Sequence, residues 1–243
     1  MRRITPLLFL ILVVNLASAQ VEVFTEYNTK ATLDGDILHV EKELSIKNNA
    51  IAPIIPGELH FQLYKASADG RKIAPEVRGL MATDYKGDPL SSSINQGSES
   101  TEVLVNVFEP LLPGFTYPLK VQYDIDFKPS GILFYEVNYP LEESSIPIEN
   151  GKYTFEVPSG TYVTYAPGAE IEKNGDRTTV VWEVEDKSQQ PTLVFEYSMV
   201  PLPLLPMKGV YLFWVSLIVL LLITLVAIIM KKRRMYKKVA RGH

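Results

Sequence analysis

An unbroken run of 22 residues without a charged side chain, from Gly209 to Met230, is the feature that most restricts how this 243-residue chain can fold. At a rise of about 1.5 Å per residue, a helix of this length reaches roughly 33 Å, enough to cross the hydrocarbon core of a bilayer. The run is bounded by groups that favour the membrane surface, namely Tyr211 and Trp214 near its start and Lys231, Lys232, Arg233 and Arg234 directly after its end. Because basic residues mark the cytoplasmic end of a span, the sequence predicts a transmembrane helix over 209–230 and a basic cytoplasmic tail over 231–243.

The start of the chain has the layout of a cleaved secretory signal. Arg2 and Arg3 precede a ten-residue apolar stretch, residues 7–16, and the small-residue site Ala17-Ser18-Ala19 follows it. The stretch is too short to cross about 30 Å of hydrocarbon. We therefore expect a signal peptide over 1–19, with an uncleaved anchor as the alternative. Together the two apolar segments predict a type I, single-pass protein of the plasma membrane, with its N-terminal domain outside and its C-terminus in the cytoplasm.

Charge is divided sharply along the chain. The net charge is −4, but residues 20–207 contain all 28 acidic residues and only 14 of the 24 basic ones. This acidic middle argues against nucleic-acid binding, which needs a basic face. The absence of cysteine from the sequence excludes disulfides, thiol catalysis and thiolate metal sites.

Between residues 20 and 200, apolar side chains recur at every second position, which is typical of half-buried strands. Clear examples are Leu59/Phe61/Leu63, Val103/Val105/Val107 and Val180/Trp182/Val184. Turn-forming pairs such as Asp34-Gly35 and Asn174-Gly175 separate such runs. About ten short strands with this spacing predict an all-β fold, an antiparallel β-sandwich rather than a parallel sheet.

We interpret the ectodomain as two packed β units. The first β-sandwich covers residues 20–128, and the second β unit, which begins near Gly131, covers residues 129–200. Pro201, Pro203 and Pro206 follow, so residues 201–208 are expected to form an extended, Pro-rich juxtamembrane spacer.

The string LLPGFTYPLKVQY, which begins at Leu111, resembles the tyrosine-corner signature of fibronectin type III and immunoglobulin-like domains. Leu112, Pro113, Gly114 and Tyr117 occupy the signature positions. In that motif the Pro-Gly pair turns the chain between two sheets, and the tyrosine hydroxyl bonds back to nearby backbone. Pro118 departs from the pattern because it lacks an amide, which predicts a strand start or edge there. The resemblance implies a fold and no activity.

Two further resemblances concern the origin of the chain. No N-x-[ST] sequon occurs, and with the missing cysteines this indicates a prokaryotic envelope protein. In composition the chain is similar to archaeal single-span surface proteins with tandem β-sandwich ectodomains. The segment DGDILHVEKELSIKNN, residues 34–49, resembles the lumenal domain of ribophorin I, and no function is transferred from that likeness.

Catalytic and metal-binding patterns are sparse. The histidines are His39, His60 and His243, and no H-x-H, H-E-x-x-H or G-x-S-x-G string occurs. We assign His39 and His60 to solvated strand faces and expect no metal site and no cofactor. The carboxylate pairs that a glycosidase or a Ca²⁺ site would need are Glu142-Glu143, Asp124/Asp126 and Asp34/Asp36. In an acidic ectodomain we interpret these pairs as solvated surface.

Aromatic residues are the remaining candidates for a binding surface. Trp182 alternates with valines and is assigned to the core. Tyr162 and Tyr165 have opposite parity, so one of them should face outward and could stack on a sugar or a peptide.

The sequence therefore favours a non-enzymatic, membrane-anchored binding or structural module of the cell envelope. Its expected partners are the lipid bilayer and an extracytoplasmic protein or glycan. Two alternatives stay open: an accessory subunit of a membrane protein complex, and a carboxylate-dependent carbohydrate-active enzyme.

Overall fold

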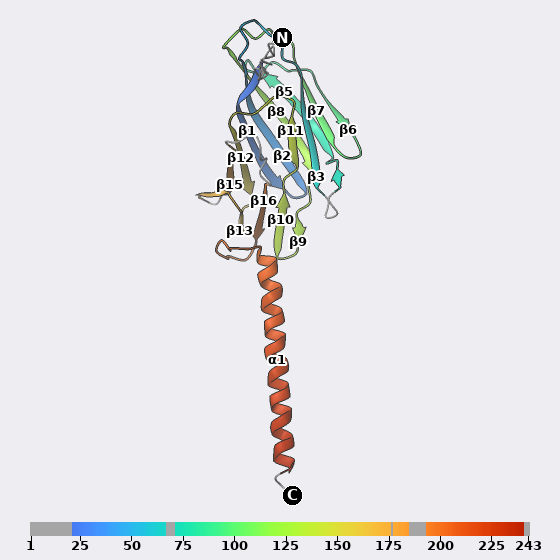
Figure 1. The fold of residues 1–243 in the computed structure, drawn as a ribbon, viewed down its shortest axis with the longest axis vertical. Coiled ribbons are helices and arrows are strands. Elements are labelled where there is room, and N and C mark those ends of the chain that lie inside the picture. Colours follow the sequence, from blue (N-terminus) through green and yellow to red (C-terminus); the bar gives the residue numbers. More distant parts are fainter. Residues whose placement is uncertain (1–20, 67–70, 176, 185–192, 241–243) are drawn as a thin grey trace, which may run out of the picture.

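The computed structural model describes residues 21–66, 71–175, 177–184 and 193–240 (Figure 1). Within these ranges sixteen strands form three sheets, and one long helix follows them. The predicted fold class, an all-β body followed by an apolar C-terminal helix, is therefore confirmed. The predicted signal peptide over 1–19 lies outside the described residues.

The largest sheet has seven strands. In spatial order they are β14 (Glu170–Asn174), β15 (Arg177–Val184), β12 (Gly151–Val157), β1 (Glu22–Asp34), β2 (Ile37–Asn48), β8 (Thr116–Asp126) and β5 (Val77–Asp84). The long hairpin of β1 and β2 turns at Asp34-Gly35, as the sequence predicted, and Gly35 takes a positive φ of 59° there. Alternate residues of β2 are buried, because one face of this sheet covers the core.

One pairing in this sheet differs from the antiparallel expectation. β12 runs parallel to β1, with Tyr27 opposite Gly151 and Thr32 opposite Glu156. The reason is a long crossover: the chain leaves β8, passes through the two smaller sheets and returns beside β1 in the same direction.

Two smaller sheets cover the inner face of the large one. The upper sheet contains β11 (Leu141–Ser144), β3 (Gly57–Ala66), β7 (Thr101–Val107) and β6 (Ser92–Gln96), with β4 (Lys72–Ile73) paired to β3. The lower sheet contains β13 (Tyr162–Tyr165), β16 (Val194–Ser198), β10 (Phe134–Asn138) and β9 (Ser130–Gly131). Ring contacts join the layers, with Phe24 6.1 Å from Phe61 and Phe155 4.7 Å from Phe195 between centroids.

Strands from both sides of the predicted boundary at residue 128 share sheets and one core. β12 pairs with β1, β11 pairs with β3, and a single hydrophobic cluster extends from Phe24 to Tyr197. The division into units over 20–128 and 129–200 stays a prediction, and their strands are interleaved.

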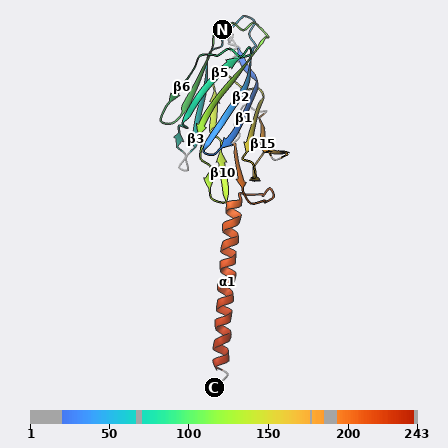
Figure 2. The same ribbon diagram turned by 180° about the vertical axis from the view of Figure 1, so that it is seen from behind.

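The helix α1 (Gly209–Ala240) projects from one end of the β body (Figures 1 and 2). Its residues Gly209–Lys232 are long and apolar enough to cross a membrane, and the most apolar 18-residue window of this stretch is not buried by the β body. The loops that join β2 to β3 and β7 to β8 lie at the opposite end of the β body.

Candidate functional site

A buried polar cluster lies between the large sheet and the upper sheet. The Lys42 ammonium on β2 is 2.5 Å from Glu142 Oε2 on β11 and donates hydrogen bonds to Tyr27 Oη and Thr29 Oγ1 on β1, both at 3.2 Å. The Tyr27 hydroxyl donates a hydrogen bond to Glu142 Oε1. The Lys42 and Glu142 side chains are 0% and 3% exposed, so all three donors of the ammonium point at internal acceptors.

Burial shapes the electrostatics of this cluster. It lowers the pKa of Lys42, and the charge of Glu142 opposes that shift. Burial together with the nearby carboxylate raises the pKa of Tyr27 well above 10. The cluster is therefore an enclosed ion pair without a path to a substrate.

The interpretation of Glu142-Glu143 as solvated surface is wrong for Glu142 and right for Glu143. The Glu143 side chain is 49% exposed and contacts Lys72 and Tyr64. Glu142 is buried because β11 adds to the edge of β3 and turns alternate side chains toward the core. The acidic residues of the other two pairs are exposed or partly exposed, as expected.

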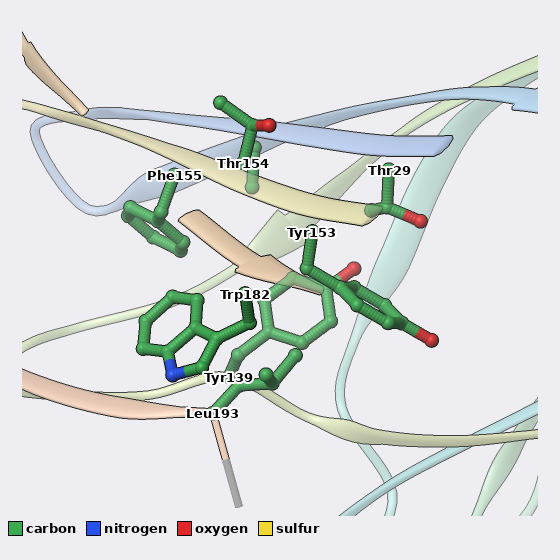
Figure 3. A pocket seen from close by; sticks show the side chains of 8 residues that line it. Thr29, Tyr139, Tyr153, Thr154, Phe155, Trp182 and Leu193 are labelled. Carbon is green, nitrogen blue, oxygen red and sulfur yellow. The ribbon is translucent and has the colours of Figure 1, made fainter. Parts of the chain in front are cut away.

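A small cavity lies between the large sheet and the lower sheet (Figure 3). Thr29, Ala31, Tyr139, Tyr153, Thr154, Phe155, Trp182 and Leu193 line it. Its volume of about 10 Å³ is enough for about one water molecule and too small for an organic ligand. Trp182 is 4% exposed, which confirms its assignment to the core, and its indole N–H donates to the Pro167 carbonyl at 3.2 Å.

An open groove of about 290 Å³ lies on the outer face of the large sheet. Lys30, His39, Glu41, Met81, Gln122 and Asp124 are among its lining residues. His39 Nδ1 is 2.7 Å from Asp124 Oδ1, and Gln122 donates to Glu41 at 3.3 Å. The groove is thus lined by side chains that bind each other. His39 and His60 both lie on solvated faces, as predicted, with side chains 48% and 40% exposed.

The tyrosine-corner residues occupy the turn before β8. Gly114 has a positive φ of 75°, and its N–H donates to the Asn48 carbonyl at 2.9 Å. Tyr117 is 5% exposed and packs edge-on against Tyr85, with ring centroids 5.7 Å apart. Among the described residues its hydroxyl makes no hydrogen bond to backbone, which differs from the motif. Here the ring anchors the turn by packing.

Five exposed apolar side chains gather beside that turn. Ile51 and Ile55 follow β2, and Phe108, Leu112 and Phe115 precede β8, with exposures from 51% to 101%. The bridge between residues 54 and 111 holds the two loops together. We name these five side chains the distal tip, since they lie at the end of the β body opposite α1 (Figure 1).

The junction between the β body and α1 contains a residue that sequence reasoning missed. The Glu196 carboxylate on β16 accepts hydrogen bonds from the backbone N–H groups of Gly209 and Val210, at 2.7 and 3.3 Å, and from Thr164 Oγ1 at 2.6 Å. A carboxylate at the first turn of a helix accepts hydrogen bonds from N–H groups that have no partner within the helix. Its negative charge also interacts favourably with the positive end of the helix dipole. Alternation placed Glu196 outward, but both faces of β16 are covered.

The Pro-rich spacer over 201–208 stays a prediction, and two contacts tie this segment to the β body. The Leu205 N–H donates to the Thr164 carbonyl at 2.7 Å, and Lys208 pairs with Glu136 at 2.7 Å. The segment is therefore held against β13 and β10 just before α1 begins.

The remaining predicted residues lie near this junction or on α1. Tyr162 is 38% exposed and Tyr165 is half-buried, and both belong to β13. On α1, Tyr211 and Trp214 are more than half exposed near the first turn, and Lys231 and Lys232 are also exposed. The backbone of Arg233 and Arg234 continues the helix.

Comparisons with known proteins give a distant likeness. No known family model matches the chain. The uncharacterized protein MJ1395 of the archaeon Methanocaldococcus jannaschii is 29% identical over 132 residues, which are 54% of this chain and 90% of that protein. The chain is therefore distantly similar to an archaeal protein.

One solved structure is similar to this fold at low identity. A Legionella pneumophila protein proposed to bind nutrients matches 73% of this chain and 67% of its own, with 10% identity and a TM-score of 0.50. An M1 zinc metallopeptidase of Deinococcus radiodurans matches 74% of this chain with 15% identity and a TM-score of 0.42, and this chain spans less than half of it. The likeness to the Legionella protein concerns the β fold alone.

Proposed function

We propose that this protein is a single-span, archaeal-type envelope protein whose β body stands outside the cell and binds an extracytoplasmic protein through its distal tip. The proposal rests on one observation, the placement of exposed apolar surface at the two ends of the β body. One end continues into α1, and the other presents Ile51, Ile55, Phe108, Leu112 and Phe115. Contiguous exposed apolar side chains are typical of protein interaction sites.

The two loops of the distal tip are nearly uncharged and are held in one conformation. Its two loops contain four prolines, Pro53, Pro56, Pro110 and Pro113, and Glu109 is their one charged residue. Asn48 braces both loops, since its side-chain amide donates to the Ala52 and Leu111 carbonyls at 2.9 and 2.8 Å. A braced loop loses little conformational entropy on binding, which favours affinity.

We propose further that the protein is not an enzyme. Glu142, which belongs to one of the three carboxylate pairs considered for glycosidase chemistry, is enclosed and paired with Lys42.

The test is purification of the tagged full chain from its native membrane. A stoichiometric extracytoplasmic protein is expected to copurify, and Phe115→Ser is expected to lose it. Met81→Ser is the matched control, because Met81 is exposed to the same degree, 61% against 62%, on a different surface. Equal retention by both variants would contradict the role of the tip. A partner whose copurification depends only on α1 would instead favour the alternative hypothesis, that the protein is an accessory subunit of a membrane protein complex.

A further inference from the structure

A second group of exposed apolar side chains surrounds the start of α1. Ile132 and Leu133 lie between β9 and β10, and the others lie between β16 and α1; the group, named here the collar, is Ile132, Leu133, Met199, Val200, Leu204 and Met207. Their exposures range from 45% to 87%. Figure 1 shows both loops beside the first turn of α1, at the end of the β body from which the helix emerges.

The collar loops differ from the rest of the β body in charge. Residues 129–135 and 197–207 contain no Asp, Glu, Lys, Arg or His, whereas residues 20–207 as a whole contain 28 acidic side chains. An acidic protein that leaves two adjacent loops uncharged and apolar has a surface suited to a non-aqueous neighbour.

The collar cannot move far from the first turn of the helix. Glu196 binds the N–H groups of Gly209 and Val210, Lys208 pairs with Glu136, and Leu205 bonds to β13. Gly209 itself leaves no room for a Cβ, which would lie 2.4 Å from the ring of Phe134. The β body is therefore joined to α1 without a flexible linker.

We propose that the collar lies in the interfacial layer of the bilayer that α1 crosses, so that lipid is its partner. The inference rests on the proposed membrane span. Since the apolar surface of α1 begins at Gly209, the interface must lie at that level, and the collar shares it. Tyr211 and Trp214 extend the same belt by one turn into the helix, where aromatic rings favour headgroups. The β body would then rest on the membrane with its distal tip directed away.

The absence of cysteine from the sequence makes a depth measurement direct. Single variants Ile132→Cys and Leu204→Cys, one in each collar loop, are spin-labelled in the full chain and reconstituted in phosphatidylcholine vesicles. Ile51→Cys is the exposed control at the distal tip, and Leu221→Cys reports on the span. Collision of each label with oxygen, which concentrates in lipid, is compared with collision with a water-soluble nickel chelate.

Both collar labels are expected to favour oxygen several-fold more than the Ile51→Cys label does, and the Leu221→Cys label should favour it most. Collar labels that match Ile51→Cys while Leu221→Cys reads as lipid-embedded would overturn the collar proposal and leave the span intact. A water-exposed Leu221→Cys label would instead overturn the span, and with it the proposed function.

Discussion

Lys42 and Glu142 bury opposite charges that contact each other and side chains of β1. Lys42→Met leaves the carboxylate buried without its cation, so we expect a loss of about 3–5 kcal/mol in the free energy of unfolding. The measurement is denaturant unfolding of the full chain in detergent. Adding Glu142→Leu should recover most of the loss, and Lys72→Met, at an exposed pair, should cost less than about 1 kcal/mol. Equal losses for the single and double variants would refute a coupled pair.

The side chain of Tyr117 contributes through its ring. Because its hydroxyl has no backbone partner among the described residues, Tyr117→Phe should change the free energy of unfolding by less than about 1 kcal/mol, the net value of one hydrogen bond. Tyr117→Ala should cost about 3–5 kcal/mol, because it leaves a void beside Tyr85. The same unfolding assay distinguishes the two variants. A large loss in the free energy of unfolding for Tyr117→Phe would show that the tyrosine hydroxyl makes the hydrogen bond of the tyrosine-corner motif after all.

The alternation pattern of the sequence predicts that Lys42 is buried, but it does not predict the burial of Glu142. Lys42 shares its parity with Val40 and Leu44, which alternation places in the core. Glu142 is buried only because β11 joins the edge of β3, a contact between distant segments that no local pattern encodes.

At the scale of elements, Glu196 couples the lower sheet to α1. Glu196→Ala removes the acceptor of two helix N–H groups, so the first turn should fray and the β body should move relative to the helix. Spin labels at Ile51→Cys and Leu221→Cys would report this as a broader distance distribution. Glu170→Ala, an exposed change on β14, is the control. A distribution as narrow in Glu196→Ala as in the control would show that the cap does not hold the joint.

Local sequence patterns predicted the positions of most strands, but few of the pairings between strands. The runs at Leu59–Leu63 and Val103–Val107 and the turns at Gly35 and Gly175 lie where the sequence placed them. The parallel pairing of β1 with β12 and the hydrogen bond between Leu205 and Thr164 join segments that are distant in the sequence. Alternation states which face of a strand is buried, but not which strand lies beside it.

For the whole molecule, buried phenols predict alkaline unfolding. Burial, followed by the charge of Glu142, raises the pKa of Tyr27, Tyr123, Tyr139 and Tyr153 above the ordinary value of 10.0. Above pH 10 the unfolded chain loses these protons while the folded chain keeps them, so the folded state binds more protons and stability falls as pH rises. The pKa of Lys42 is lower in the folded state than its ordinary value of 10.5, so this group makes stability rise with pH, but only below about pH 10.5.

We therefore expect the denaturation midpoint of the full chain to drop steeply between about pH 10 and 11.5, with tyrosinate absorbance appearing on unfolding. Tyr153→Phe should make the drop shallower. A midpoint that is constant across this range would contradict the enclosed aromatic core.

The central claim is a β body outside the membrane, anchored by α1 with its end in the cytoplasm. Labelling of Ile51→Cys and His243→Cys variants with a membrane-impermeant maleimide in intact cells tests it most directly, since the sequence contains no other cysteine. We expect Ile51→Cys to react at once, and His243→Cys to react only after the cells are permeabilised. Reaction of His243→Cys in intact cells, with Ile51→Cys protected, would contradict it.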